Sequence, residues 1–582
     1  MHIKTRTHTC GALRESDVGA KVTLVGWVHR HRDLGSLIFI DLRDRFGRTQ
    51  VVIDPKTLPV GHSLGFEYVI TVSGEVVRRK DANPQLATGA IEVVAQEVHI
   101  LSASAVLPFS VADTISGEAH DELRLQYRYL DMRRGPILDN LVLRHRAMMA
   151  TRAFLDARGF VEVTTPILGK STPEGARDYL VPSRIYPGSF YALPQSPQLF
   201  KQILMIGGLD RYFQIATCFR DEDLRADRQP EFSQIDIEMS FATHEELFPI
   251  IESLVQQIFT SCKDATLPSP FPQMSYDTCM ELYGTDKPDL RFGMEFIKLN
   301  ELAMQLPFPV FQEALGNGGI VKGFTVTGGA DISRKGIEEL TSYVELLGGK
   351  GLIWMKLVDG ELSSSIRKYV TAENAACWIE RLKMQKGDAA FIVAGPVRKT
   401  HQLLDHLRRR IARERNYIQA HHFAPLWVTD FPLFAYNEEE SRLESEHHPF
   451  TCPHLEDLHL LDTAPLKARS SSYDLVLNGY EIASGSQRIH DSALQEKIFL
   501  TLGISPEERV NRFGFFIEAL RYGTPPHLGI ALGFDRLMMI LAGTESIRDI
   551  VAFPKTQKAQ DLMTKAPSQV SEQQLKELKI KI

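Results

Sequence analysis

Two carboxylates lie close together on a predicted β-hairpin. The dipeptide Asn478-Gly479 is the strongest two-residue signal for a hairpin turn, and the resulting register pairs Val476 with Glu481. Asp474 then falls on the face of Glu481 as a diagonal neighbour, with the backbones about 7 to 8 Å apart. Two such acids repel each other unless a cation lies near them, and Mg²⁺ takes one or two carboxylates together with phosphates and water. The hairpin therefore predicts a magnesium site at Asp474 and Glu481, and a pair of acids on a solvated face is the alternative.

A charged loop supplies a second chemical signature. Residues 219–232 join two alternating segments, 212–220 and 232–240, which indicates a loop between two antiparallel strands. Arg220 lies at the end of the first segment, with Glu222 two residues further on. A fixed cation beside carboxylates suits a nucleoside triphosphate with its metal ion. A hairpin with a solvated charged tip is the alternative.

The second of these strands has two unlike faces. Its polar face is formed by Gln234, Asp236 and Glu238. Its apolar face is formed by Ile235, Ile237 and Met239. We therefore expect one side of the strand to pack in a core and the other to line a site.

A helix is predicted within residues 196–208. It starts with a serine cap and a first-turn proline and stops at paired glycines. Gln198 and Lys201 are three residues apart, so they project from the same side of this helix. A polar pair on the surface of an amphipathic helix is the alternative.

Three segments together resemble the signature motifs of the class II aminoacyl-tRNA synthetases. Residues 159–166 are similar to motif 1, residues 219–232 to motif 2 and residues 529–536 to motif 3. Motif 2 has the form found in aspartyl-tRNA synthetases of the bacterial type, and the resemblance covers nearly the whole chain. It implies a ligase that activates L-aspartate with ATP to aspartyl-adenylate, releases pyrophosphate and transfers the aspartyl group to the 3′ end of tRNA(Asp).

The resemblance assigns an aspartate-binding site. Its members would be Glu174, Gln198, Lys201, Arg220, His447, His448 and Arg488. Glu174 would lie near the α-ammonium group, and Lys201 would meet the side-chain carboxylate. Arg488 would select aspartate, because a planar guanidinium grips a carboxylate through two parallel hydrogen bonds, whereas an amide presents a donor to donors. The family usually has GGGSxRIH here, and this chain has Ala-Ser-Gly at 483–485 before the intact Arg-Ile-His.

The resemblance also assigns an ATP-binding site. Its members would be Arg220, Asp221, Glu222, Gln229, Phe232, Glu481, Gly533, Phe534, Asp535 and Arg536, with Mg²⁺ at Asp474 and Glu481. Arg220 and Arg536 would be catalytic: Arg220 would act on the α-phosphate, and Arg536, in the first turn of a helix, on the γ-phosphate or the adenine face. Phe232 would stack on adenine. No protein nucleophile is required.

Residues 22–102 suggest a small Greek-key barrel of the OB type. Five strand-like runs with glycine-containing turns cover 22–29, 36–44, 48–54, 67–79 and 91–102. In the second run the apolar residues Ile38, Ile40 and Leu42 would face inward. Phe39 would face outward beside the basic run 29–32, as a stacking platform next to phosphate-binding charge, or else as a lone exposed aromatic. The resemblance assigns anticodon recognition to this barrel, through Arg32, Phe39, Gln50 and Glu97.

The expected fold is a multidomain α+β protein. It combines an N-terminal OB-type β-barrel, a class II synthetase catalytic domain with an antiparallel sheet, and an α/β insertion domain. The expected boundaries are 1–105 for the OB-fold anticodon-binding domain, 106–135 for a hinge, 136–285 and 421–560 for the catalytic domain, 286–420 for the insertion domain and 561–582 for a C-terminal tail. An insertion of this size is typical of the bacterial aspartyl type. The tail is a candidate for a short amphipathic helix.

The composition of the chain limits which cellular compartment and which binding partners are expected. The chain has 582 residues, of which 24% are charged and 43% hydrophobic, as in an ordinary soluble protein of several domains. A net charge of −7 excludes a uniformly basic nucleic-acid-binding surface, so RNA contacts must use local patches. The six cysteines lack CxxC pairs, which favours reduced thiols, and no long apolar run predicts a membrane span. We expect a cytoplasmic protein with no membrane partner.

Several alternatives remain open at this point. The class resemblance implies a homodimer. Some members of this group also charge tRNA(Asn), and Leu34, in a barrel loop, resembles selective members. An asparaginyl or lysyl synthetase would share the barrel and the motifs, but it would not need Lys201 with Arg488 and would lack the insertion. A non-catalytic RNA-binding relative is the alternative from another class, and the intact motif arginines and Glu481 argue against it.

Overall fold

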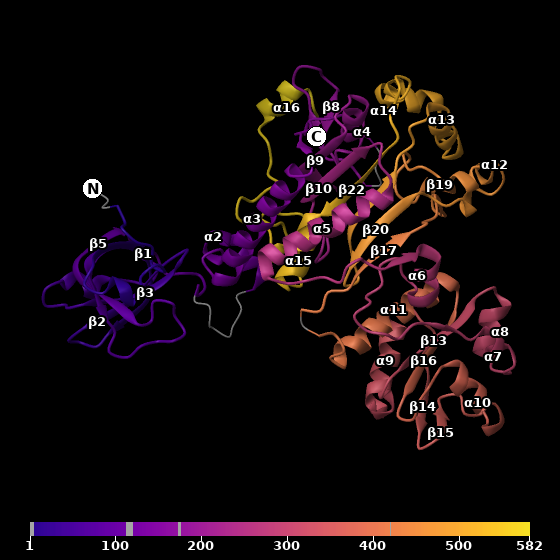
Figure 1. Ribbon diagram of the computed structural model, residues 1–582, viewed down its shortest axis with the longest axis horizontal. Helices are drawn as coiled ribbons and strands as arrows, with labels where there is room; N and C mark the ends of the chain where they lie inside the picture. Colours follow the sequence, from indigo (N-terminus) through magenta and orange to yellow (C-terminus); the bar gives the residue numbers. More distant parts are fainter. Residues whose placement is uncertain (1–4, 112–119, 173–175, 420, 582) are drawn as a thin grey trace. The chain divides into compact units, whose positions relative to one another are not determined.

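The computed structural model describes residues 5–111, 120–172, 176–419 and 421–581. The chain divides into two units, residues 1–141 with 561–566 and residues 142–560 with 567–582 (Figure 1). None of the helices in the described ranges is both long and apolar enough to cross a membrane.

The first unit contains a closed β-barrel with the strand order β1-β2-β3-β5-β4. The strand bounds are β1 Lys21–Asp33, β2 Ile38–Asp44, β3 Gly47–Ile53, β4 Val69–Arg78 and β5 Ile91–Ser102. Alternation along β2 sends Ile38, Ile40 and Leu42 into the interior, where all three are fully buried. The barrel predicted from the sequence is therefore confirmed.

The described residues from 120 onward continue with the helices α1 (Asp121–Gln126), α2 (Arg128–Asp131) and the long α3 (Gly135–Asp156). Asp131 is fully buried, and its carboxylate accepts hydrogen bonds from Arg128 at 2.6 Å and from Arg124 at 3.1 Å. Because a buried carboxylate needs such partners, this cluster fixes the turn that leads into α3.

The second unit is built around a mostly antiparallel sheet. Its order is β11-β17-β20-β21-β22-β10-β9-β6, with parallel pairs at the two edges. The strand bounds are β6 Val161–Glu162, β9 Arg211–Phe219, β10 Glu231–Ser240, β11 Gln273–Ser275, β17 Pro425–Thr429, β20 Ser472–Leu477, β21 Tyr480–Gln487 and β22 His527–Gly533. Within residues 159–166, which resemble motif 1, the strand covers only β6. Beyond it, Thr165 donates from both its N–H and its hydroxyl to Gln214 Oε1, at 3.2 and 2.9 Å.

The two faces of this sheet differ as the alternation predicts. The apolar residues of β10, from Ile235 to Met239, share one hydrophobic core with α5 (His244–Lys263) and α15 (Phe534–Ala542), which run beside the central strands in Figure 1. The polar residues of β10 point to the other side, toward α4 (Gln198–Ile206). The polar face is thereby left to line a site.

The segment between β11 and β17 forms a second sheet with the order β12-β13-β16-β14-β15. Its strands are β12 Ile297–Lys298, β13 Ile320–Val326, β14 Ile353–Val358, β15 Glu361–Ser364 and β16 Ala389–Gly395. The helices of this region are α6 Tyr276–Tyr283, α7 Asn300–Met304, α8 Pro309–Gly316, α9 Arg334–Leu346, α10 Ala372–Arg381 and α11 Val397–Glu414. We call residues 286–420 the inserted segment.

Smaller elements complete the second unit. They are β7 Leu180–Pro182, β8 Phe190–Ala192, β18 Phe434–Asn437, β19 Arg442–Ser445, α12 Leu460–Thr463, α13 Ser492–Thr501, α14 Pro506–Ala519 and α16 Glu572–Leu578. Helix α16 starts after a capping serine, Ser571, whose hydroxyl accepts from the N–H of Gln574 at 3.3 Å. The helix expected in the tail is therefore confirmed.

Candidate functional site

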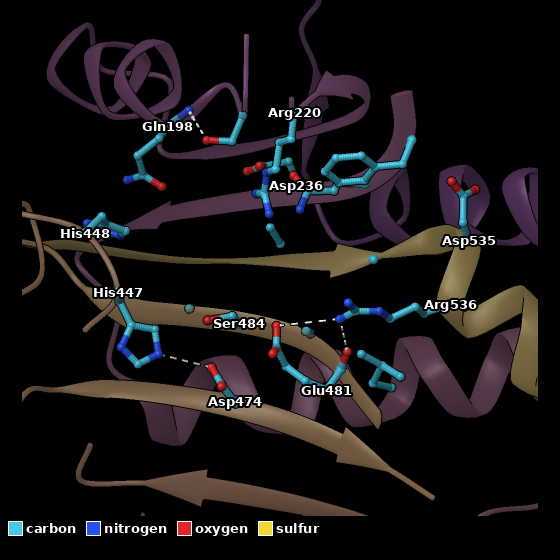
Figure 2. Close-up of a pocket in the computed structure, with 18 of the residues that line it drawn as sticks. Gln198, Arg220, Asp236, His447, His448, Asp474, Glu481, Ser484, Asp535 and Arg536 are labelled. Carbon is cyan, nitrogen blue, oxygen red and sulfur yellow. Dashed lines mark hydrogen bonds and ion pairs between the residues drawn. The ribbon is translucent and has the colours of Figure 1, made fainter. Parts of the chain in front are cut away.

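A cavity of about 410 Å³ lies over the polar face of the central sheet (Figure 2). The strand register places Asp474, Ser484, Ala531 and Asp236 opposite one another on β20, β21, β22 and β10. Directly opposed residues point to the same face, and all four line the cavity. This row therefore forms its floor.

The β20–β21 hairpin confirms one part of the predicted register and corrects another. Val476 pairs with Glu481, as the turn signal predicts. A bulge next to Val476 then shifts the pairing by one residue, so that Asp474 lies opposite Ser484 and is not the simple diagonal neighbour of Glu481. Both carboxylates still line the cavity. The pair is therefore brought together as expected, but through an irregular strand.

Two buried cations lie at one end of the cavity, each held by carboxylates of β10. Lys201 Nζ donates to Asp236 Oδ1 at 2.5 Å and lies 3.2 Å from Glu238 Oε2. Arg488 donates to Glu238 from Nε at 2.9 Å and from Nη2 at 3.1 Å. All four side chains are buried. Buried charges persist only when they are paired in this way.

Burial and pairing set the protonation states at this end. Burial opposes the ionised form of Glu238, but Arg488 and Lys201 outweigh it and lower the pKa of Glu238 to about 2. Burial raises the pKa of Asp236 against the attraction of Lys201. Burial, reinforced by Arg488, lowers the pKa of His448 well below its ordinary value. Glu238 is therefore charged and His448 neutral at physiological pH.

Most donors of Arg488 already have partners within the protein. Its Nε–Nη2 edge is occupied by Glu238, and Nη1 donates to His448 Nε2 and to Ser486 Oγ, both at 2.6 Å. A guanidinium has five N–H donors, so within the described residues one Nη2 hydrogen is left for a ligand. A two-bond grip on a ligand carboxylate would require one of these internal partners to move.

Four buried polar atoms along the cavity have no hydrogen-bond partner among the described residues. They are Gln198 Nε2, Arg220 Nε, Asp236 Oδ2 and His447 Nδ1. Leaving such atoms unsatisfied costs free energy, and a polar ligand would supply the partners. The set contains the nitrogen donors of Gln198 and Arg220, a ring nitrogen of His447 and a carboxylate acceptor, which suits a ligand that carries both an anionic and a cationic group.

Two arginines lie toward the other end of the cavity. The guanidinium carbon of Arg220 lies 5.0 Å from the centre of the Phe232 ring. Arg536, the third residue of α15, donates from Nη1 to the backbone oxygen of Glu481 at 2.9 Å, and its Nε lies 3.2 Å from Asp227 Oδ2 (Figure 2). Both arginines line the cavity, and Arg536 lies in the first helical turn, as predicted.

Other predicted residues of this end differ in how far they reach the cavity. Glu222 lines it and pairs with Arg228 at 3.0 Å. Gln229 also lines it, but its amide closes on the backbone of Lys555, accepting at 2.7 Å and donating at 3.1 Å. Gly533 lines the cavity as the residue that precedes α15. The hydrogen-bonding groups of Gln229 are therefore engaged in the fold.

Three other predicted residues are held in different ways. Phe534 is fully buried in the core, with the Arg144 guanidinium 4.8 Å from its ring centre, because the first residue of α15 faces inward. Asp221 bridges to the backbone of Arg177 and is not among the cavity-lining residues. Asp535 lines the cavity but is held by Arg144 and by the N–H of Ser233 at 3.1 Å.

The predicted Glu174 lies outside the residues that the structure describes.

Acidic side chains gather where the metal site is predicted. Asp474 and Glu481 line the cavity, and so do Asp286 and Glu446. Burial, followed by the charge of Asp474, raises the pKa of Glu481 against the attraction of Arg536 and Lys287. In the described ranges, no group of three or more His, Cys, Asp or Glu side chains is arranged to hold a metal by itself. Two carboxylates fit Mg²⁺, which completes its shell with phosphate oxygens and water.

His447, which also lines the cavity, lies beside these acidic side chains. His447 Nε2 lies 3.4 Å from Asp474 Oδ1. Burial works against protonation of His447, but the hydrogen bond and charge of Asp474 raise its pKa. The pKa values of His447 and of its neighbour His448 are therefore shifted in opposite directions.

Several residues that line the cavity have no role assigned from the sequence, among them Asp236, Ser484, Asp286 and Glu446. Asp236 was placed on a polar strand face by alternation alone, and that phasing was a signal that could have marked it. Ser484 was noted as a departure from glycine, and the register shows that its side chain faces the cavity. Asp286 and Glu446 sit in loops without periodicity, so nothing local in the sequence indicates them.

The barrel brings most of its predicted RNA-contacting residues together. Arg32 donates to Gln50 Oε1 at 3.1 Å, and its guanidinium carbon lies 5.9 Å from the centre of the Phe39 ring. Gln50 in turn donates to Glu92 Oε2 at 2.6 Å. Glu97 lies on β5, paired with β4. The first three form one patch across β1, β2 and β3, and whether RNA binds there stays a prediction.

Comparison with known proteins gives two family matches. Residues 120–557 match the family described as "tRNA synthetases class II (D, K and N)", and residues 22–101 match the "OB-fold nucleic acid binding domain". These matches cover the barrel and the central sheet with the inserted segment.

Relatives of similar length share more than half of the residues. A protein of Protochlamydia amoebophila named "Aspartate--tRNA(Asp/Asn) ligase" is 60% identical over 99% of this chain and 97% of its own length. A protein of the same name from Chlamydia caviae is 57% identical over the whole of both chains.

Solved structures show the same fold at lower identity. An asparaginyl-tRNA synthetase of Pyrococcus horikoshii, complexed with asparaginyl-adenylate, has a TM-score of 0.58 at 20% identity and covers 94% of this chain and 98% of its own. A putative aspartyl-tRNA synthetase of Leishmania major has a TM-score of 0.59 at 19% identity, with coverage of 95% and 94%.

Proposed function

The chain belongs to the class II tRNA synthetases of the D, K and N group, and on this basis we propose that it is an aspartate-tRNA ligase. It would activate L-aspartate with ATP and transfer the aspartyl group to the 3′ end of tRNA. The observation that carries this proposal is the pair of buried cations, Lys201 and Arg488, held by Asp236 and Glu238 at one end of a cavity whose other end presents Arg220 and Arg536.

The unpartnered atoms suggest how aspartate would bind. Asp236 Oδ2 would accept from the α-ammonium group. Lys201 and the remaining Nη2 hydrogen of Arg488 would meet the side-chain carboxylate. Gln198 Nε2 is free to donate to the amino acid. Asparagine would turn an NH₂ group toward these donors and leave them unpaired, which is the kind of mismatch that gives strong discrimination.

Adenylate formation would use the residues toward the other end. The α-carboxylate oxygen of aspartate attacks the α-phosphorus of ATP, and the bond from that phosphorus to the bridging oxygen breaks to release pyrophosphate. Arg220, whose Nε lacks a partner, would donate to the α-phosphate as charge builds on it. Phe232 would stack on adenine and Arg536 would contact the nucleotide. Mg²⁺ held by Asp474 and Glu481 would supply neutralisation of phosphate charge.

Transfer to RNA completes the reaction. A hydroxyl of the 3′-terminal adenosine attacks the carbonyl of the adenylate, loses its proton and displaces AMP. The oriented reactants need no protein nucleophile. The test is charging of purified tRNA(Asp) with radiolabelled aspartate, and a failure to form aspartyl-tRNA in the presence of ATP would overturn the proposal.

We propose that tRNA(Asn) is a second substrate. The relatives at 60% and 57% identity carry names that include both tRNAs. This runs against the selectivity suggested by Leu34, which is 70% exposed in the loop between β1 and β2. Separate transcripts of tRNA(Asp) and tRNA(Asn) decide the matter, because charging of the first alone would contradict a dual substrate.

The remaining proposals concern organisation. We propose that the barrel binds the anticodon, with the domain boundaries at the residues predicted from the sequence. We further propose a homodimer in the cytoplasm. Sedimentation of the purified protein tests the dimer, since a monomer at micromolar concentration would contradict it.

A further inference from the structure

A lysine at the start of the inserted segment joins two carboxylates of the cavity. Lys287 Nζ lies 3.5 Å from Asp286 Oδ2 and 3.8 Å from Glu481 Oε2. Both acids line the cavity, whereas Lys287 does not. The lysine therefore reaches the cavity only through the carboxylates that it holds.

Glu481 is bracketed by cations on both of its oxygens. Lys287 lies near Oε2, and Arg536 Nη1 lies 3.9 Å from Oε1, as Figure 2 shows for the arginine side. Asp474 and Asp286 line the same cavity and repel the Glu481 carboxylate. Without a second cation, Glu481 would be free to turn away from its acidic neighbours.

The loop that carries Lys287 is fixed by helix α11 of the inserted segment. Arg408 on α11 is fully buried, and it donates to the backbone oxygens of Asp289 at 2.6 Å, Phe292 at 3.1 Å and Gly293 at 3.0 Å. Its guanidinium carbon lies 4.4 Å from the ring centre of Phe292 and 4.8 Å from that of Tyr283. One arginine therefore clamps three carbonyls of this loop.

The same loop packs against the tip of the β20–β21 hairpin. A Cβ atom on Gly479, where φ is +82°, would lie 3.1 Å from the Cβ of Asp289. Asp289 is held in turn by Arg291, at 2.9 and 2.6 Å. The hairpin that carries Glu481 and the loop that carries Lys287 are thus in direct contact.

We propose that Lys287 is a positioning residue for adenylate formation, which holds Glu481 in place for the nucleotide and its metal ion, and that the inserted segment fixes Lys287 through Arg408. This inference rests on the proposed function. It gives the inserted segment a part in activation of the amino acid.

A merely structural role for Lys287 predicts a different result. Its side chain is 44% exposed and its two ion pairs are long, so they contribute little to folding stability. Loss of nucleotide binding without loss of thermal stability is therefore the signature of positioning.

The experiment compares K287M with K287R and with a matched control, K350M. Lys350 also lies in the inserted segment, and its Nζ pairs with Glu313 at 2.6 Å. The Lys350 side chain is 72% exposed, more than that of Lys287. Aspartate-dependent ATP–pyrophosphate exchange gives kcat and the KM for ATP at varied Mg²⁺, and calorimetry gives Mg²⁺-dependent ATP binding without aspartate. We expect the KM and the dissociation constant for ATP to rise about tenfold in K287M, a step of about 1.4 kcal/mol, with kcat and Tm little changed. K287R should recover most of the affinity, and K350M should match the wild type.

The Arg408 clamp is tested by a double-mutant cycle. R408K keeps the charge but loses the fork that reaches three carbonyls, and its Tm shows whether the fold survives. If Arg408 acts through Lys287, the effects of R408K and K287M on ATP binding should not add. Additive effects would overturn the part assigned to the inserted segment.

The outcomes separate this inference from the proposed function. Exchange by the wild type together with unchanged ATP binding in K287M overturns the role of Lys287 alone. If the wild type shows no aspartate-dependent exchange, the proposed function fails, and calorimetry with ATP and Mg²⁺ still decides whether Lys287 positions Glu481.

Discussion

Arg488 and Glu238, which are 250 positions apart in the sequence, are joined by two hydrogen bonds, from Nε at 2.9 Å and from Nη2 at 3.1 Å. Both side chains are buried at the end of the cavity, and Lys201 lies 3.2 Å from the same carboxylate. A guanidinium fixed in this way is already oriented before a ligand arrives. Pre-organisation of this kind lowers the entropic cost of binding.

Removal of the Arg488 guanidinium should affect both stability and activity. R488L leaves Glu238 buried with Lys201 alone, and breaking a buried ion pair from one side costs about 3 to 5 kcal/mol. The rate of aspartate-dependent exchange should fall at least about 100-fold, which corresponds to a loss of about 2.7 kcal/mol of transition-state stabilisation. R488K, which keeps a charge without the fork, should also lose activity.

The control for this prediction is R521L. Arg521 forms an exposed surface pair with Glu518 at 3.1 Å, so its removal should leave Tm and exchange unchanged. Exchange by R488L equal to that of the wild type would rule out the role given to Arg488.

The Glu238 carboxylate predicts a specific dependence of stability on pH. Its pKa is about 2 in the folded protein and 4.5 for the unperturbed group, so the ionised form stabilises the fold above pH 4.5. This contribution, on the order of 3 kcal/mol, is lost as the pH falls through 2. In urea unfolding, the difference in free energy between the wild type and E238Q should be constant from about pH 7 to 5 and shrink below 4.5. A difference that stays unchanged down to about pH 3 would contradict this account.

Substitution of Gly485 should destabilise the fold more than substitution of its neighbour Ser484. A Cβ on Gly485 would lie 2.2 Å from the backbone oxygen of Gly529 and 2.6 Å from the Tyr473 ring, so G485A should destabilise the fold by about 1 to 3 kcal/mol or more. Ser484 faces the cavity, and S484G should lower stability by only about 0.5 to 1 kcal/mol through backbone entropy. Thermal unfolding of both variants checks this contrast, and equal Tm values would refute it.

The barrel patch predicts a selective effect on tRNA. Phe39 lies beside Arg32, and stacking of one base on an aromatic side chain is worth about 1 to 3 kcal/mol. F39A should therefore raise the KM for tRNA about 5- to 100-fold and leave ATP–pyrophosphate exchange unchanged. F66A removes another exposed aromatic of the barrel, 60% exposed, and should have no effect. A similar rise in KM for both variants would exclude a specific site at Phe39.

Strand phasing is the part of the site that could be predicted from the sequence. The alternation of β10 correctly separated the core residues from Gln234, Asp236 and Glu238, because a strand with one buried face fixes the direction of every side chain. The Asn-Gly turn likewise gave the pairing of Val476 with Glu481.

Contacts between distant segments could not be predicted in the same way. The bulge beside Val476 depends on how β21 fits between two neighbouring strands, and the strand sequence alone does not specify it. Phe534 enters the core while Arg536 reaches the cavity, because a helix turns side chains to opposite faces within two residues. Lys287 lies in a loop whose conformation is set by Arg408, over a hundred residues away, and no local pattern marks it.

The most direct test of the account is ATP–pyrophosphate exchange by the wild-type protein with aspartate, asparagine and lysine supplied separately. The cavity presents Lys201 and Arg488 to the side chain of the amino acid, so exchange should depend on aspartate. The rate with asparagine or lysine should be at least about 1000-fold lower, which corresponds to about 4 kcal/mol. Exchange that proceeds equally well with asparagine or lysine, or that fails with aspartate, would contradict the assignment of this site.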